Sequence, residues 1–206
     1  MNVTRVKVCG VTRVEDAVFA VDAGVALIGL NFVPSSPRCV TIEQAQKLVA
    51  AIAGRAEVVA VVANLAWSQM AALRAEVGVD TLQLHGDEPP EVFRSLSAND
   101  YKAIRVADAT DVALARRYPG QRLLVDAKVP GVLGGSGHVF DWRLVAELAK
   151  ERSLILAGGL TPDNVEAAVT QVRPWAVDVA SGVEAAPGKK SSEKVVSFLR
   201  RSVGLS

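Results

Sequence analysis

The first candidate for chemistry is a cysteine that shares one side of a short apolar segment with a lysine. Lys7 and Cys9 stand two residues apart, and valines alternate with them. Because side chains alternate along a strand, Lys7 and Cys9 should point to the same side. A nearby cation favours the thiolate, which can act as a base or nucleophile near neutral pH, whereas a thiol cannot. The alternative interpretation of Cys9 is a small buried apolar residue.

The second candidate is an aspartate at the end of another apolar run. Asp126 closes the segment Arg122 to Asp126. Such an aspartate could simply cap the turn that follows. Alternatively, it is a general acid, and a proton donor facing Cys9 would complete the minimum set for an isomerisation that moves protons between neighbouring carbons and oxygens. The pair can act together only if the fold brings both strand ends to one place.

The elements that would position these residues follow an alternating pattern. Eight short runs rich in Val, Ile and Leu each precede a longer segment with helical periodicity. The expected strands are Arg5 to Cys9, Ala26 to Phe32, Val58 to Ala63, Thr81 to Leu84, Tyr101 to Val106, Arg122 to Asp126, Leu154 to Ala157 and Ala176 to Ala180. The expected helices are Val14 to Ala23, Ile42 to Ala53, Ser68 to Val77, Pro90 to Leu96, Asp108 to Tyr118, Trp142 to Lys150, Pro162 to Gln171 and Ser192 to Arg201.

This pattern predicts an α/β protein with a single (β/α)8 TIM barrel domain over residues 1–206. Strands that are apolar on both faces are typical of parallel sheets covered by helices. The 206 residues give about 26 per unit, which suits a barrel with few insertions. An open doubly wound sheet is the alternative, but the segment Cys9 to Arg13 lacks its Gly-x-Gly-x-x-Gly turn. In a barrel, the ends of all eight strands meet at one mouth.

Two glycine turns at the last two strand ends predict a phosphate site. Gly158 and Gly159 lead into a helix that Thr161 should cap, and Ser181 and Gly182 follow the last strand. Glycines let backbone N–H groups approach an anion, and a helix N-terminus adds a favourable dipole. Barrels commonly bind phosphate between these two loops. The alternative is that the glycines serve only tight turns.

Three further features concern the mouth. Asp178, on the eighth expected strand, could pair with Lys7 only if the barrel closes. His85 follows the fourth strand and should line the ligand, although a hydrogen-bonded core histidine is the alternative. The glycine-rich segment Ala127 to Phe140 is the longest expected loop, and long loops are often functional.

The composition excludes several classes of function. A formal net charge of +1 provides no global field for nucleic acid or anionic membrane. No apolar run reaches the roughly 18 residues of a spanning helix, and charges at Arg5 and Lys7 exclude a signal peptide, so we expect a cytoplasmic protein. Cys9 and Cys39 have neither a Cys-x-x-Cys partner nor a histidine cluster, which argues against a disulfide framework or a zinc site.

Taken together, the motifs resemble the N-(5'-phosphoribosyl)anthranilate isomerases of tryptophan biosynthesis. The resemblance spans nearly the whole chain, and its strength lies in the order and spacing of many short motifs. The matching segments are Lys7 to Thr12, Asn31 to Arg38, Gln83 to Gly86, Leu124 to Asp126, Gly134 to Gly137, Phe140 to Trp142, Leu156 to Leu160, Asn164 to Val165 and Val177 to Glu184.

The resemblance implies an Amadori rearrangement of a phosphoribosyl aminoaldose to an aminoketose, without cofactor or metal. Cys9 resembles the general base that takes the proton from C2' of the sugar, and Asp126 resembles the acid that protonates the ring oxygen. Arg38 resembles the residue that binds the anthranilate carboxylate, which suits a guanidinium fork, although it could equally be a solvated loop charge. The expected substrate-binding residues are Arg38, His85 and Asp178, and the expected phosphate-binding residues are Gly135, Gly158, Gly159, Ser181 and Gly182.

Several alternatives stay open at this point. Another sugar-phosphate isomerase or epimerase, or an indole-forming synthase, could use the same barrel. The synthase needs Lys and Glu catalysts at strand ends, and strands two, three and five offer no convincing set. A metal-dependent epimerase needs His and Asp ligands, and the only histidines are His85 and His138. A non-catalytic phospho-ligand-binding barrel would need neither Cys9 nor Asp126. Asn31 could contact ligand or only a loop. We expect one small phosphorylated ligand and a monomer or homodimer.

Overall fold

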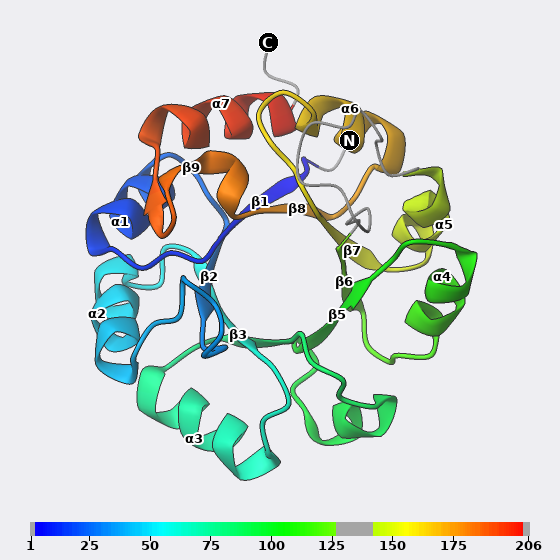
Figure 1. Ribbon diagram of the computed structural model, residues 1–206, viewed down its shortest axis with the longest axis horizontal. Helices are drawn as coiled ribbons and strands as arrows, with labels where there is room; N and C mark the ends of the chain where they lie inside the picture. Colours follow the sequence, from blue (N-terminus) through cyan, green and yellow to red (C-terminus); the bar gives the residue numbers. More distant parts are fainter. Residues whose placement is uncertain (1–2, 127–141, 204–206) are drawn as a thin grey trace.

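Eight parallel strands close into a barrel in the computed structural model, which describes residues 3–126 and 142–203. β1 pairs with β2 on one side and with β8 on the other, so the ring has no open edge. Figure 1 shows this ring with the helices outside it. The predicted barrel is confirmed and the open sheet is excluded. The strands are β1 (Arg5–Cys9), β2 (Leu27–Asn31), β3 (Glu57–Val62), β4 (Thr81–Leu84), β5 (Tyr101–Arg105), β6 (Arg122–Asp126), β7 (Ser153–Ala157) and β8 (Ala176–Val179).

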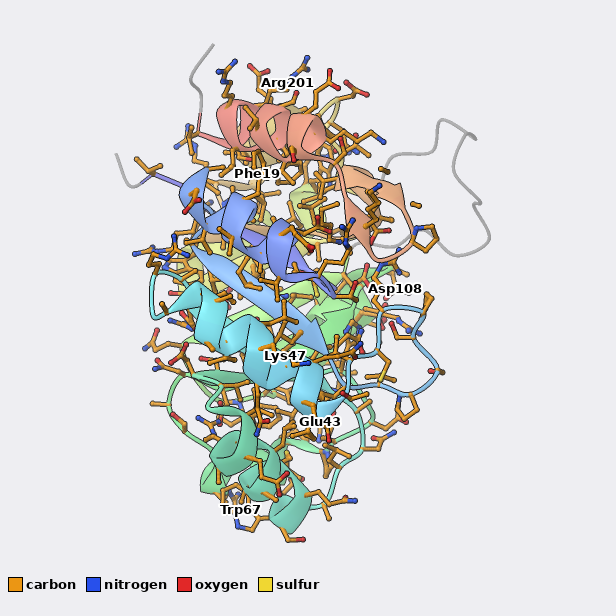
Figure 2. The ribbon with its side chains drawn as sticks, turned by 90° about the vertical axis from the view of Figure 1, so that its left-hand side faces the viewer. Phe19, Glu43, Lys47, Trp67, Asp108 and Arg201 are labelled. Carbon is orange, nitrogen blue, oxygen red and sulfur yellow. The ribbon has the colours of Figure 1, made fainter. Side chains whose placement is uncertain are left out.

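Seven α-helices among the described residues cover the outside of the barrel. Each buries an apolar stripe against the strands and keeps its charged side in water. In α2, for example, Ala45 and Leu48 are buried, while Glu43 and Lys47 lie on the outward side that faces the viewer in Figure 2. No helix in the described parts of the chain is long and apolar enough to cross a membrane. The helices are α1 (Val14–Asp22), α2 (Ile42–Ile52), α3 (Trp67–Val77), α4 (Ala109–Arg116), α5 (Arg143–Glu151), α6 (Val165–Val172) and α7 (Ser192–Ser202).

The structure corrects the sequence prediction at two helices. The fourth predicted helix, Pro90 to Leu96, is the 3₁₀ helix η1 (Pro90–Ser95), whose apolar residues are only partly buried, so packing gives little support to a regular α-helix. The helix expected to begin at Pro162 begins at Val165 instead, because Asn164 accepts a hydrogen bond from the Thr161 N–H and completes a turn first.

A short hairpin after the barrel was not predicted. The 3₁₀ turn η2 (Ser181–Val183) leads into β9 (Glu184–Ala186), which pairs antiparallel with β10 (Lys189–Lys190). Gly188 makes the turn with φ +78°, which a side chain would strain. The hairpin lies beside α1, where the Asp16 carboxylate accepts a hydrogen bond from the Lys190 N–H at 2.8 Å.

The core has two layers, one between the strands and the helices and one inside the barrel. The inner layer contains every second residue of the strands, for example Leu27 of β2 and Val59 of β3. Lys7, which pairs in register with Leu27, is fully buried among these residues. The inward alternation then continues to Cys9 and Asp126 at the strand ends. The residues of the inner cluster are Leu27, Val59, Tyr101, Ala103, Leu124, Ile155, Ala157 and Ala176.

Candidate active site

The mouth of the barrel gathers the residues that the sequence singled out for chemistry. Cys9 ends β1, Asp126 ends β6, and both follow inward-facing positions two residues earlier on their strands. His85 directly follows β4, and Asp178 lies in β8. All four side chains are partly or largely shielded from water. The fold therefore places a thiol, two carboxylates and an imidazole around the same opening.

A buried ion pair joins the first and last strands beneath Cys9. The ammonium nitrogen of Lys7 lies 3.1 Å from Oδ1 of Asp178, and the Lys7 side chain is fully buried. Burial alone would lower the pKa of Lys7, but the Asp178 carboxylate and the neighbouring Cys9 raise it above its ordinary value. Lys7 therefore stays charged in the barrel interior. The predicted contact between Lys7 and Asp178 is confirmed.

The cysteine itself does not rest as the thiolate that the nearby lysine led us to expect. Burial raises the pKa of the Cys9 thiol, and this effect exceeds the opposing attraction of Lys7. The carboxylate of Asp178 adds to the increase, while Lys190 opposes it. The cation is present as predicted, but burial outweighs it and Asp178 partly compensates its charge, so the net direction is opposite to the expectation. Cys9 is a thiol at neutral pH.

The space beside Cys9 exists because β2 has a glycine there. Gly29 pairs in register with Cys9, and a Cβ at Gly29 would lie 2.8 Å from the Cys9 sulfur and 3.1 Å from the Lys7 ammonium nitrogen. The first contact is too short for real atoms, and the second would require the Lys7 side chain to move. The sequence analysis did not select Gly29, although a lone glycine inside an apolar strand is itself a signal of close approach.

His85 is held as a neutral ring. The hydroxyl of Tyr101 donates to Oε1 of Gln83, which turns the Gln83 amide nitrogen towards His85 Nδ1 at 3.4 Å. We infer that Nδ1 accepts and that Nε2 carries the proton. Burial lowers the pKa of His85, and this outweighs the nearby Asp126 carboxylate, which raises it. The Nε2 atom is buried and has no hydrogen-bond partner among the described residues.

Arg38 lies over the end of β1 and is not a solvated loop charge. Its guanidinium binds both carboxylate oxygens of Glu184, with Nε at 2.7 Å and Nη2 at 2.6 Å. The Arg38 side chain is 20% exposed, and its Cδ would lie 2.4 Å from a Cβ at Gly10. Only glycine at this position lets the arginine cross the chain directly after Cys9. Asn31, by contrast, accepts a hydrogen bond from the Val33 N–H at 2.8 Å and so serves its own loop.

The two glycine loops expected to hold phosphate lie against each other. A Cβ at Gly182, after β8, would lie 1.9 Å from the carbonyl oxygen of Leu160, after β7. Gly158 and Gly159 have φ values of +100° and +65°, which glycine alone adopts without strain. Ser181 begins η2 beside them. Gly135, the remaining residue of the expected phosphate site, lies outside the described residues.

Two charged residues of the site were missed by the sequence analysis. Glu184 and Lys190 belong to the unpredicted hairpin, and their partners Arg38 and Cys9 lie more than a hundred residues away in the chain. The burial of Glu184 would raise its pKa, but its bonds to Arg38 and Lys190 lower the pKa to about 2. No local spacing connects these residues, so only the closed barrel reveals the contact.

The chain matches known proteins of one kind over almost its full length. The family model described as N-(5'phosphoribosyl)anthranilate (PRA) isomerase matches residues 6–201. The N-(5'-phosphoribosyl)anthranilate isomerase of Magnetococcus marinus is 45% identical over 195 residues, which cover 95% of this chain and 93% of that protein. The corresponding protein of Stutzerimonas stutzeri is 45% identical over 204 residues, 98% of each chain.

Solved structures agree with these sequence matches. The crystal structure of phosphoribosyl anthranilate isomerase from Thermotoga maritima superposes with a TM-score of 0.89 at 38% identity and covers 98% of this chain and 100% of its own. A second isomerase structure holds reduced 1-(o-carboxyphenylamino)-1-deoxyribulose 5-phosphate and superposes with a TM-score of 0.86 at 35% identity, with the same coverage. Sequence and fold therefore point to the same set of relatives.

Proposed function

Because this chain belongs to the N-(5'-phosphoribosyl)anthranilate isomerase family and catalyses that isomerisation in tryptophan biosynthesis, we propose that Cys9 and Asp126 perform its two proton transfers. The observation that carries the proposal is their position. Each is the last inward-facing residue of its barrel strand, and the two strands end at the same mouth. One residue can accept a proton and the other can donate one, as an aldose to ketose isomerisation requires.

The reaction begins with the opening of the sugar ring. Asp126 protonates the ring oxygen, the bond from that oxygen to C1' breaks, and the anthranilate nitrogen forms an iminium with C1'. Cys9, as the thiolate, then takes the proton from C2', and the electrons of that bond form the C1'=C2' double bond while the iminium is neutralised. The resulting enolamine tautomerises to the aminoketose. Substrate and product contain the same atoms, so no oxidant or reductant is consumed.

The neutral state of His85 suits a proton donor at Asp126. A cationic imidazolium nearby would stabilise the Asp126 carboxylate and so favour the form that has no proton to donate. Burial lowers the pKa of His85 and keeps the ring uncharged at neutral pH. Its buried Nε2–H can then donate a hydrogen bond to an oxygen of the substrate. We assign His85, together with Asp178, to the lining of the substrate site.

Two anionic ends of the substrate have separate anchors. The ligand in the related solved structure carries both a ring carboxylate and a phosphate. We assign Arg38 to the carboxylate, and the glycine loops at Gly158, Gly159, Ser181 and Gly182 to the phosphate, because such loops can donate backbone N–H groups to an anion. Binding at both ends would hold C1' and C2' over the barrel mouth.

A steady-state assay of the purified protein tests the activity. Freshly generated phosphoribosylanthranilate is supplied, and the loss of its fluorescence is followed against a protein-free control that corrects for spontaneous hydrolysis. We expect turnover without added metal or cofactor, and unchanged turnover after treatment with a chelator. Loss at the rate of the control would contradict the proposal.

Two further statements remain predictions. A relative from Thermotoga maritima is described as a dimeric isomerase from which monomers were generated, so both a monomer and a homodimer stay possible states for this chain. A cytoplasmic location also stays a prediction.

A further inference from the structure

A chain of three buried or half-buried charges connects the proposed carboxylate anchor to the hairpin after β8. Arg38 binds both oxygens of Glu184, and Oε1 of Glu184 also lies 3.0 Å from the ammonium nitrogen of Lys190. The side chains of Glu184 and Lys190 are 6% and 3% exposed. We call Arg38, Glu184 and Lys190 the hairpin cluster.

The cluster is fixed to the ends of two barrel strands. Lys190 donates to the carbonyl oxygen of Cys9 at 2.7 Å and to that of Ala180 at 3.1 Å, at the ends of β1 and β8. The N–H of Gly188 donates to Glu184 Oε1 at 3.2 Å from within the hairpin turn. Glu184 is therefore held by several bonds that do not involve Arg38.

The mode of binding leaves one edge of the guanidinium for another anion. Glu184 occupies the edge formed by Nε and Nη2. A guanidinium is planar, so the N–H groups of Nη1 and the second N–H of Nη2 form a separate fork on a different edge. That fork matches a second carboxylate in the same plane. Rotation of the Arg38 side chain would destroy this arrangement, and the bonds to Glu184 prevent such rotation.

The charges of the hairpin cluster favour the same occupant. Two cations and one anion leave a net charge of plus one in a partly desolvated place. An arriving carboxylate would neutralise that charge, whereas a neutral ring would not. We therefore expect the hairpin cluster to favour an aromatic amine that carries a carboxylate over one that does not.

We propose that Glu184 is a positioning residue that fixes the guanidinium of Arg38 for the ring carboxylate of the substrate, with Lys190 as its anchor. The inference rests on the proposed role of Arg38 and extends it to the residues that make the role possible. Glu184 and Lys190 do not need to touch the substrate.

Equilibrium binding of two stable ligands tests the inference. One ligand is reduced 1-(o-carboxyphenylamino)-1-deoxyribulose 5-phosphate, and the other is the same molecule without the carboxyl group. The measured quantity is the dissociation constant of the ligand without the carboxyl group divided by that of the ligand with it. This ratio isolates the contribution of the carboxylate to binding. We expect Glu184→Gln to reduce this ratio about tenfold, because the guanidinium regains its rotamers and must be ordered again on binding, and this loss outweighs the attraction gained by removing a negative charge. A ratio equal to that of the wild type would overturn the inference.

Two variants separate positioning from general damage. Glu88 is an equally buried glutamate that pairs with a buried lysine, Lys102, at 2.8 Å on another side of the barrel. Glu88→Gln should lose a similar amount of stability and leave the ratio unchanged. In an Arg38→Met background, Glu184→Gln should cause no further change in the ratio, because the group that it positions is gone. An equal further change in that background would contradict the inference.

The design also covers poor folding and failure of the proposed function. If Glu184→Gln does not fold, Glu184→Asp keeps the negative charge beside Lys190 but is one methylene shorter, so it should reduce the ratio without unfolding the protein. A wild-type protein that binds neither ligand, or binds both equally, would contradict the proposed function itself. If the wild type distinguishes the two ligands and both Glu184 variants do so equally well, only the positioning role is contradicted.

Discussion

The chemistry of Cys9 depends on a balance between burial and charge. Burial raises the pKa of the thiol, and the ion pair of Lys7 with Asp178 beneath it is nearly neutral as a unit. A general base with a pKa above neutrality is present as the thiolate in a small fraction of molecules, but each thiolate is a stronger base. The residue scale therefore predicts a thiol whose reactivity increases on the alkaline side.

The first prediction concerns this pH dependence. Cys9 is protonated below its raised pKa, so the rate of its alkylation by iodoacetamide, which needs the thiolate, should still increase as the pH rises past 9.0, the ordinary value for the thiol. The measurement uses a Cys39→Ser variant, because Cys39 is exposed and would react as well. A plateau of the alkylation rate below pH 8 would contradict a raised pKa of Cys9.

A substitution in the ion pair tests the sign of the effect. The Asp178 carboxylate raises the pKa of Cys9, whereas Lys7 and Lys190 lower it. Asp178→Asn removes the negative charge and leaves Lys7, so the pKa of Cys9 from the alkylation profile should decrease. An increase would show that the pair does not act on Cys9 through its charge. Tyr101 and Arg38 also interact electrostatically with Cys9 and are unchanged in this comparison.

At the scale of the elements, β2 makes room for the reacting group of β1. A glycine at position 29 avoids crowding Cys9 and Lys7, since a Cβ there would lie 2.8 Å from the Cys9 sulfur and 3.0 Å from the Cys9 Cα. The backbone of β1 cannot retreat without breaking its pairing with β8. The position of the thiol thus depends on the glycine of the neighbouring strand β2 as well as on its own strand, β1.

Gly29→Ala should therefore damage both stability and activity. We expect a loss of about 1–3 kcal/mol in the free energy of unfolding, as for an overpacked core, together with a reduced kcat from a displaced Cys9. Chemical denaturation and the steady-state assay measure the two effects. Gly78→Ala is the control: it ends α3 at φ +77° with open space around it, so it should cost about 1 kcal/mol of stability and leave kcat/KM unchanged. Wild-type stability of Gly29→Ala would contradict the packing argument.

The repeating elements were predictable because their signals are local. Apolar runs and capping residues such as Thr41, whose side chain caps α2 with Gln44, mark strands and helices directly. The hairpin of β9 and β10 is too short to carry such a pattern, and the bonds of Glu184 with Arg38 connect distant parts of the chain. The sequence accordingly indicated Cys9 and Asp126, but it could not indicate the residues that hold Arg38.

At the scale of the whole molecule, closure of the barrel and construction of the site are the same event. Strands β1 and β8 become neighbours only when the ring closes, and the Lys7 to Asp178 pair forms across that seam. Lys190 joins the same two strand ends from outside the barrel through the carbonyl oxygens of Cys9 and Ala180. The thiol is placed correctly only after both ends of the chain have come together.

The ion pair between β1 and β8 predicts a large effect of a single substitution on the free energy of unfolding. Lys7→Met leaves the Asp178 carboxylate without its buried partner and should lower the free energy of unfolding by about 3–5 kcal/mol. Combining it with Asp178→Leu removes both charges and should restore a large part of that loss. Denaturant titrations of the two single variants and the double variant give the coupling. Purely additive losses would show that the pair does not stabilise the closed barrel.

The central claim is that Cys9 and Asp126 carry the two proton transfers, and the most direct test is the kcat of Cys9→Ala and of Asp126→Asn beside the wild type. We expect each variant to lose about 10² or more in kcat, as for removal of a positioned base or acid, while binding of the reduced product analogue changes little. Wild-type kcat in either variant would contradict the role assigned to that residue.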